Sequence, residues 1–117
     1  MDIQTIEGEN YVVRSDSASA TAVLEGSLRL SGPEAYSPID QLLRTLLAQQ
    51  PELITLDLRK LDFLNSSGIN MISKFVISVR RHEDVNMQVL GSSDIPWQGK
   101  SLKNLQRLLP QLILTLE

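Results

Sequence analysis

The sequence predicts an α/β domain in which helices pack mainly on one face of a mixed β-sheet. Two observations support this fold class. The stretch from 53 to 92 follows the order strand, helix, strand, with the lengths of a βαβ unit whose strands run parallel. Another amphipathic helix is expected over residues 37–50, and its apolar stripe requires a sheet to cover it. Because no repeat or linker interrupts the chain, we expect one domain over residues 1–117.

The N-terminal part is expected to supply short strands. Residues 10–16 and 21–32 place β-branched and apolar residues among polar ones. The second of these segments is predicted to be a hairpin that turns at Glu25-Gly26-Ser27.

The helix over residues 37–50 has a recognisable start and end. Ser37 is suited to the N-cap, Pro38 to the first helical position, and Asp40 lies three residues after the cap. Pro51 ends the pattern. The apolar side chains recur at helical spacing on one face, namely Ile39, Leu42, Leu43, Leu46 and Leu47.

The βαβ unit forms the second half of the pattern. Residues 53–64 begin with strict alternation of Ile54, Leu56 and Leu58 against other side chains, which is typical of a buried strand. An amphipathic helix follows and ends near residue 84, and residues 86–92 are expected to form the next strand. A last helix over residues 99–110 and a strand over residues 111–117 complete the predicted fold.

Composition excludes several classes of function. The net charge is −3, so the chain has no general attraction for nucleic acid or for an anionic membrane. There is no cysteine, which excludes disulfides and thiolate chemistry and fits a reducing cytoplasm. The first ten residues lack the basic start and apolar core of a signal peptide, and no apolar run is long enough to span a bilayer. We therefore expect a cytoplasmic protein that binds neither nucleic acid nor membrane.

Candidate catalytic residues are few. His82 is the single histidine and lies at a predicted helix end, where an imidazole is commonly a partner of the helix dipole. Asp57 and Asp62 lie close to Arg59 and Lys60, which favours solvated charge over a catalytic pair. There is no metal-ligand motif, no phosphate-binding glycine loop and no nucleophile–base pair. The sequence therefore predicts a protein that is not an enzyme and carries no cofactor or metal.

Trp97 is open to two interpretations. Tryptophan is enriched in interface hot spots, so this side chain is a candidate anchor for a partner protein. The favoured interpretation is that it packs over the start of the last helix.

The sequence "NSSG" at residues 65–68 is the most unusual local feature. Asn65 or Ser66 is expected to cap the following helix by accepting hydrogen bonds from backbone N–H groups. A single cap residue would be enough, yet the chain places two hydroxyls, Ser66 and Ser67, before Gly68. A phosphate on Ser66 would lie at a helix N-terminus, where free N–H groups and the helix dipole favour an anion. It would add about −1.5 to −2 units of charge, which can alter binding without unfolding the domain.

This stretch resembles the central signature of STAS domains, specifically of anti-sigma-factor antagonists. Within "LDLRKLDFLNSSGINMISKFV" a strand leads through a hydrophobic turn and a hydroxyl–hydroxyl–glycine sequence into an amphipathic helix. The antagonists carry Asp where this chain has Asn65. SiaC-like regulatory phosphoproteins, a STAS-related branch, are similar in having Asn at this place, and their pattern also resembles "LRLSGPEAYSPIDQLL" with its tyrosine and proline.

The resemblance implies a single STAS-like fold without catalytic activity and a phosphorylation site at Ser66, with Ser67 as the alternative. It implies a Ser/Thr protein kinase of the anti-sigma type and a PP2C-type phosphatase as partners. The antagonist branch binds the kinase when unphosphorylated and thereby regulates transcription. The SiaC-like branch instead binds and activates a diguanylate cyclase.

We therefore predict a signal-transduction phosphoprotein that switches partners. Its docking surface is expected to comprise the turn at residues 65–68 and the outward face of the following helix, with Asn70, Ser73 and Lys74. The alternative is a constitutive STAS scaffold or oligomerisation module, including a homodimer, in which the serine only caps the helix. Binding of a nucleotide or a small hydrophobic ligand has no motif to support it.

Overall fold

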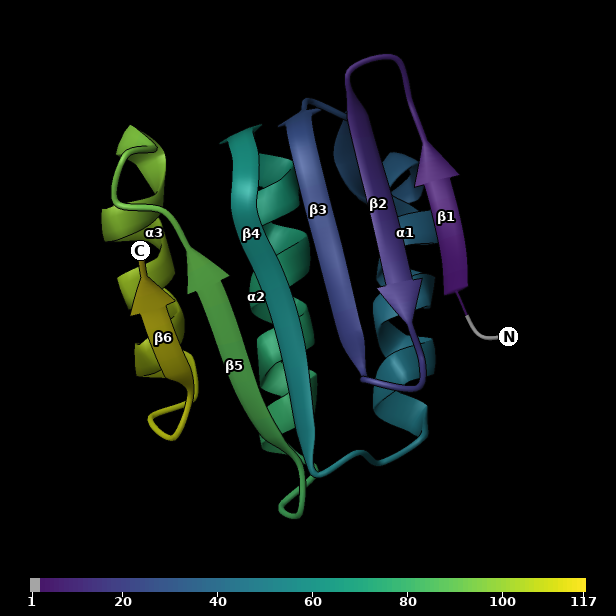
Figure 1. Ribbon diagram of the computed structural model, residues 1–117, viewed down its shortest axis with the longest axis vertical. Coiled ribbons are helices and arrows are strands. Elements are labelled where there is room, and N and C mark those ends of the chain that lie inside the picture. Colours follow the sequence, from purple (N-terminus) through teal and green to yellow (C-terminus); the bar gives the residue numbers. More distant parts are fainter. Residues whose placement is uncertain (1–2) are drawn as a thin grey trace.

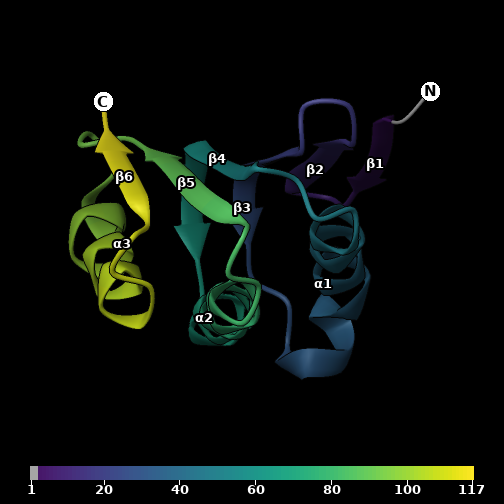
Figure 2. The same ribbon diagram turned by 90° about the horizontal axis from the view of Figure 1, so that it is seen from below.

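Three helices cover one face of a six-stranded sheet, as Figures 1 and 2 show from two directions. The structure is a computed structural model that describes residues 3–117. The predicted fold class, a mixed sheet with helices on one face, is confirmed. In chain order the elements are β1 (Ile3–Glu7), β2 (Tyr11–Asp16), β3 (Thr21–Leu28), α1 (Gly32–Ala48), β4 (Leu53–Leu64), α2 (Ser66–Arg80), β5 (Asn86–Gly91), α3 (Pro96–Leu108) and β6 (Ile113–Leu116).

The strands lie side by side in the order in which they occur along the chain. The first three pair antiparallel, whereas β3 to β6 pair parallel. Each helix follows one parallel strand and crosses back over the same face. All three helices therefore begin at the same end of the sheet, where β3, β4 and β5 finish (Figure 1).

The N-terminal strands differ from the prediction in two ways. Strand β1 was not expected, because its five residues lack a clear alternation of apolar and polar side chains. The hairpin predicted at Glu25-Gly26-Ser27 is wrong, since β3 continues through all three residues. Gly26 has a φ of 93° and lies where the register between β3 and β4 shifts, so this glycine serves a bulge and not a turn. The chain reverses earlier, at residues 17–20.

Helix α1 begins earlier than predicted. Ser31 is the N-cap and Pro33 lies in the first turn, so the predicted cap at Ser37 is wrong. Pro38 lies inside the helix. A serine followed closely by a proline occurs twice, as Ser31 with Pro33 and as Ser37 with Pro38, and the first pair starts the helix. The apolar stripe predicted for this helix is buried as expected.

The other elements match their predicted positions more closely. The alternating side chains Ile54, Leu56 and Leu58 of β4 are at most 1% exposed. Helix α3 begins at Pro96, three residues before the predicted start. No helix within residues 3–117 is both long and apolar enough to cross a bilayer.

Candidate functional site

Asn65 is the cap residue of α2, which settles which of the two predicted residues has this role. Its backbone is extended, with φ of −80° and ψ of 176°, as an N-cap requires. Its Oδ1 accepts a hydrogen bond of 3.0 Å from the N–H of Gly68, and its carbonyl accepts one of 2.9 Å from the N–H of Ile69. The N–H groups of Ser66 and Ser67, the first two of the helix, have no acceptor within the helix.

The Asn65 side chain also joins α2 to α1 and to the loop that precedes α1. The buried Tyr36 hydroxyl of α1 donates a hydrogen bond of 2.6 Å to Asn65 Oδ1. Asn65 Nδ2 donates one of 2.8 Å to the carbonyl of Leu30. Burial raises the pKa of the Tyr36 phenol, so it remains a donor at neutral pH. The amide of Asn65 therefore uses both its acceptor and its donor to hold the turn in place.

Gly68 is required by the close approach of Leu64 and Tyr36. A Cβ atom at Gly68 would lie 2.7 Å from the Tyr36 hydroxyl oxygen and would overlap the buried Leu64 side chain. The glycine in "NSSG" thus makes room for the tyrosine that holds the cap.

The two hydroxyls of the turn have different surroundings. Ser66 is exposed, whereas Ser67 is half-buried on the side of α2 that faces α1. Within residues 3–117 neither hydroxyl forms a hydrogen bond with a protein group, because Asn65 already supplies the cap.

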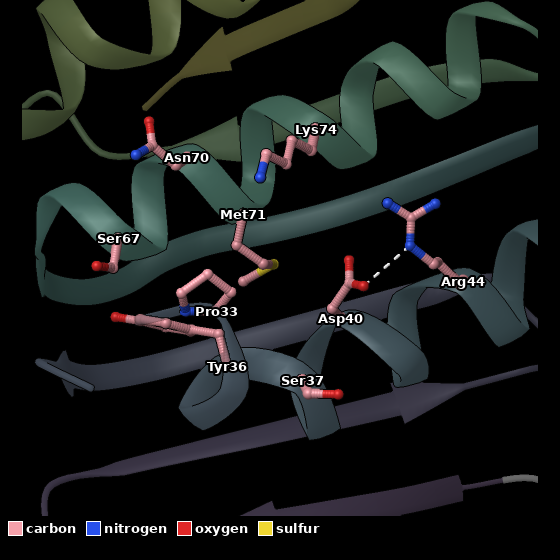
Figure 3. Close-up of a pocket in the computed structure, with 9 residues that line it drawn as sticks. All are labelled: Pro33, Tyr36, Ser37, Asp40, Arg44, Ser67, Asn70, Met71 and Lys74. Atoms are coloured by element: carbon pink, nitrogen blue, oxygen red, sulfur yellow. Dashed lines mark hydrogen bonds and ion pairs between the residues drawn. The ribbon is translucent and has the colours of Figure 1, made fainter. Parts of the chain in front are cut away.

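A groove of about 240 Å³ separates the first halves of α1 and α2 (Figure 3). On the α2 side it is lined by Ser67, Asn70, Met71 and Lys74. The α1 side contributes Pro33, Tyr36, Ser37, Asp40 and Arg44.

Arg44 has a fixed position at one end of this groove. Its Nε donates to Asp40 Oδ2 at 2.9 Å, and its Nη1 donates to Ser78 Oγ of α2 at 2.8 Å. Among the described residues Lys74 forms no ion pair, so its ammonium group is the free charge of the groove.

The predicted docking residues therefore divide into two sets. Ser67, Asn70 and Lys74 line the groove with α1. Ser66 and Ser73 lie on the part of α2 that faces away from the sheet, seven residues apart and thus two turns along the helix.

Sequence reasoning missed the α1 side of the site. Tyr36, Asp40 and Arg44 were read only as parts of a helix pattern or of a resemblance. Tyr36 was the residue that could have indicated this side of the site. It is the one hydroxyl-bearing aromatic in an otherwise aliphatic buried stripe, and a buried phenol needs a hydrogen-bond partner.

The remaining candidates of the sequence form structural contacts. His82 Nδ1 lies 2.9 Å from the Ser78 carbonyl, just beyond the end of α2. The half-buried Trp97 donates from Nε1 to the Leu61 carbonyl at 3.1 Å at the start of α3. Within residues 3–117 no cluster of three His, Cys, Asp or Glu side chains is suited to a metal ion.

Asp57 departs from the prediction of solvated charge. Its carboxylate accepts three hydrogen bonds from Arg59, of 3.0 Å from Nε, 2.8 Å from Nη2 and 3.1 Å from the backbone N–H, and its side chain is 14% exposed. The hydrogen bonds from Arg59 hold the pKa of Asp57 below its usual range. Asp62 is exposed, as predicted.

Comparison with known proteins identifies the fold. No protein-family model matches the chain, and no curated protein sequence matches it. Among solved structures, SiaC of Pseudomonas aeruginosa matches with a TM-score of 0.76 and 13% identity, over 100% of this chain and 98% of that one. A chain from the crystal structure of the Pseudomonas aeruginosa diguanylate cyclase SiaD in complex with its activator SiaC matches with a TM-score of 0.75 and 12% identity, over 97% and 99% of the two chains. Apo-SiaC from the same organism matches with a TM-score of 0.71 and 14% identity, over 100% and 99%. The predicted SiaC-like fold is thereby confirmed.

Proposed function

We propose that this chain is a non-catalytic regulator that binds a partner protein through the N-terminal half of α2 and is released when Ser66 is phosphorylated. One observation carries the proposal. Ser66 is exposed at the first position of α2 and is not needed as a cap, because Asn65 provides the cap. The hydroxyl is therefore accessible to a kinase without any unfolding of the turn.

The surroundings of Ser66 are suited to a phosphate. Within residues 3–117 the N–H groups of Ser66 and Ser67 have no hydrogen-bond acceptor, and the positive end of the helix dipole lies beside them. A phosphate would thus be tolerated by the fold while it adds charge at the start of α2, one helical turn before Asn70, which lines the groove. Ser66 is favoured over Ser67 as the modified residue, because Ser67 is half-buried against α1.

The similar fold of SiaC supports a signalling enzyme as the partner. In the complex named above, SiaC is the activator of a diguanylate cyclase. We propose that the unphosphorylated chain binds a diguanylate cyclase in the same manner, and that a Ser/Thr kinase and a PP2C-type phosphatase control its state. In the alternative form of this proposal, the same phosphorylation of Ser66 controls binding to an anti-sigma kinase and thereby regulates transcription.

The first test is mass spectrometry of the protein purified from its native cells, with phosphatase treatment as the control. Phosphate on Ser66 is the expected result, and phosphate on Ser67 would move the site by one residue. The second test compares binding of the captured and purified partner by wild type, Ser66→Ala and Ser66→Asp. We expect Ser66→Ala to bind like wild type and Ser66→Asp to bind about tenfold more weakly, a loss of about 1.4 kcal/mol.

Ser19→Asp is the matched control for added charge. Ser19 is exposed in the turn between β2 and β3, at the opposite end of the sheet from the start of α2 (Figure 1). This variant should bind like wild type. Equal binding by all variants, together with the absence of phosphate, would refute the switch and leave a constitutive scaffold.

A further inference from the structure

The groove between α1 and α2 carries more positive than negative charge. Its lining includes Lys74 of α2 together with Asp40 and Arg44 of α1 (Figure 3). Asp40 already accepts a hydrogen bond of 2.9 Å from Arg44, and within residues 3–117 Lys74 forms no ion pair. Two cations therefore share one carboxylate, in a chain whose net charge is −3. A second carboxylate is what this group of charges lacks.

The three charges lie at about the same level along the two helices. Helices α1 and α2 begin at the same end of the sheet and run side by side. The hydrogen bond of 2.8 Å from Arg44 Nη1 to Ser78 Oγ joins the helices at one level. Asp40 and Lys74 each precede these residues by four positions, about one turn of helix, so they face each other across the groove. A carboxylate that enters the groove here can reach both Lys74 and Arg44.

The part of the groove nearer the helix starts is apolar. Pro33 and Met71 line it, together with Tyr36, whose hydroxyl is held by Asn65. Met71 and Tyr36 are 7% and 1% exposed, so they form a fixed floor. The volume of about 240 Å³ is below the roughly 300–1,000 Å³ of pockets that enclose a drug-sized ligand. The groove is suited instead to a few side chains of another protein.

We infer that the groove receives an acidic segment of the partner protein, in which an apolar side chain packs on Met71 and a neighbouring carboxylate pairs with Lys74 and Arg44. This inference rests on the proposed function, because it names the chemistry of the partner that docks on α2. The proposed release by phosphorylation requires the same sign of charge. A phosphate on Ser66 repels an acidic segment, whereas it would attract a basic one.

Binding of the captured and purified partner by Lys74 variants tests this chemistry. Lys74→Glu should weaken binding at least about tenfold, because it places a carboxylate opposite the carboxylate of the partner. Lys74→Arg keeps the positive charge and should bind like wild type. Added salt should weaken the binding of wild type more than that of Lys74→Gln, since ions screen a charge pair at the surface.

Lys103→Glu is the matched control, because Lys103 is also an exposed lysine of a helix but lies on α3. It makes the same change of charge and should bind like wild type. Circular dichroism melts check that each variant is folded. A charge swap then locates the carboxylate: when each Asp and Glu of the partner is replaced by Lys in turn, one replacement should restore binding to Lys74→Glu.

Lys74→Glu that binds no more weakly than Lys103→Glu would overturn the inference. Tighter binding by Lys74→Glu would also overturn it, and would indicate a basic segment. Ser66→Asp separates this failure from a failure of the switch. If Ser66→Asp binds weakly and Lys74→Glu binds like wild type, the switch stands and the acidic segment is wrong. If Lys74→Glu binds weakly and Ser66→Asp binds like wild type, the acidic segment stands and the switch is wrong.

Discussion

Replacement of Asn65 by aspartate tests why this chain has an amide where anti-sigma-factor antagonists have a carboxylate. The two side chains have nearly the same shape. As acceptors they are equivalent, since Oδ1 would still receive the hydrogen bonds from Tyr36 and Gly68. As donors they differ, because a carboxylate cannot donate to the Leu30 carbonyl that now lies 2.8 Å from Nδ2.

The expected loss follows from these contacts. Loss of one hydrogen bond costs about 1 kcal/mol, and an acceptor left facing another acceptor costs about 1–3 kcal/mol when water is excluded. Asn65 and Leu30 are only half-buried, so water relieves part of the second cost. A negative charge at a helix N-terminus returns about 0.3–1 kcal/mol. We therefore expect Asn65→Asp to lower the free energy of unfolding by about 1–2 kcal/mol at neutral pH, the balance of these effects.

Urea unfolding of wild type, Asn65→Asp and Asn65→Ala at several pH values measures this difference. Asn65→Ala should be less stable than Asn65→Asp, because it also removes the cap and leaves the buried Tyr36 hydroxyl without its acceptor. At acid pH the introduced carboxyl group takes up a proton and can donate to the Leu30 carbonyl. The gap between Asn65→Asp and wild type should therefore close as pH falls. An aspartate variant as stable as wild type at neutral pH would refute this account of Asn65.

Two further variants probe the contacts around the Asn65 cap, and a third probes the Asp57–Arg59 ion pair of β4. Gly68→Ala should lose about 1–3 kcal/mol of stability in urea unfolding, because the added Cβ overlaps Leu64 and crowds the Tyr36 hydroxyl. Tyr36→Phe should lose about 0.5–1.5 kcal/mol. Burial raises the pKa of this phenol. The stability that the hydroxyl contributes is therefore complete below its unfolded pKa of about 10 and is lost as pH rises through the folded value. The difference in stability between Tyr36→Phe and wild type should shrink in alkaline melts. Arg59→Gln should lower the free energy of unfolding only slightly, because the Arg59 side chain is exposed and water screens the pair. The pKa of Asp57 is lowered in the fold, so this cost should be present above about pH 4 and should vanish as pH falls through the folded value.

The sequence was most informative where burial sets the pattern. Strand β4 and helix α2 occur almost where the alternation and the helical spacing placed them, because one face of each is wholly buried. Strand β1 was missed because an exposed edge strand has no buried face to impose a pattern. Gly26 was misread because glycine is equally suited to a turn and to a bulge, and only the pairing partner, β4, distinguishes them.

The site was predicted along one helix only. Residues 65–68, Asn70 and Lys74 are contiguous or at helical spacing, so their common location could be read from the chain. Tyr36 lies 29 residues before Asn65, and its contact depends on how α1 and α2 pack against the same sheet. That distance in sequence is why no local pattern indicated the hydrogen bond that holds the cap.

Because Asn65 caps α2 and Ser66 is the proposed modification site, Ser66→Asp is not expected to destabilise the fold. If Ser66 were the cap, its replacement would remove a hydrogen bond from the helix start and destabilise the fold. Because Asn65 is the cap, an acidic side chain at Ser66 only adds charge beside free N–H groups at the positive end of α2. Ser66→Asp should therefore be as stable as wild type or more stable by about 0.3–1 kcal/mol, while it binds the partner more weakly. Thermal melts at low and high salt measure this, since a dipole interaction weakens with ionic strength. A strongly destabilised Ser66→Asp would mean that weakened binding reflects unfolding, and the phosphorylation switch would lose its physical basis.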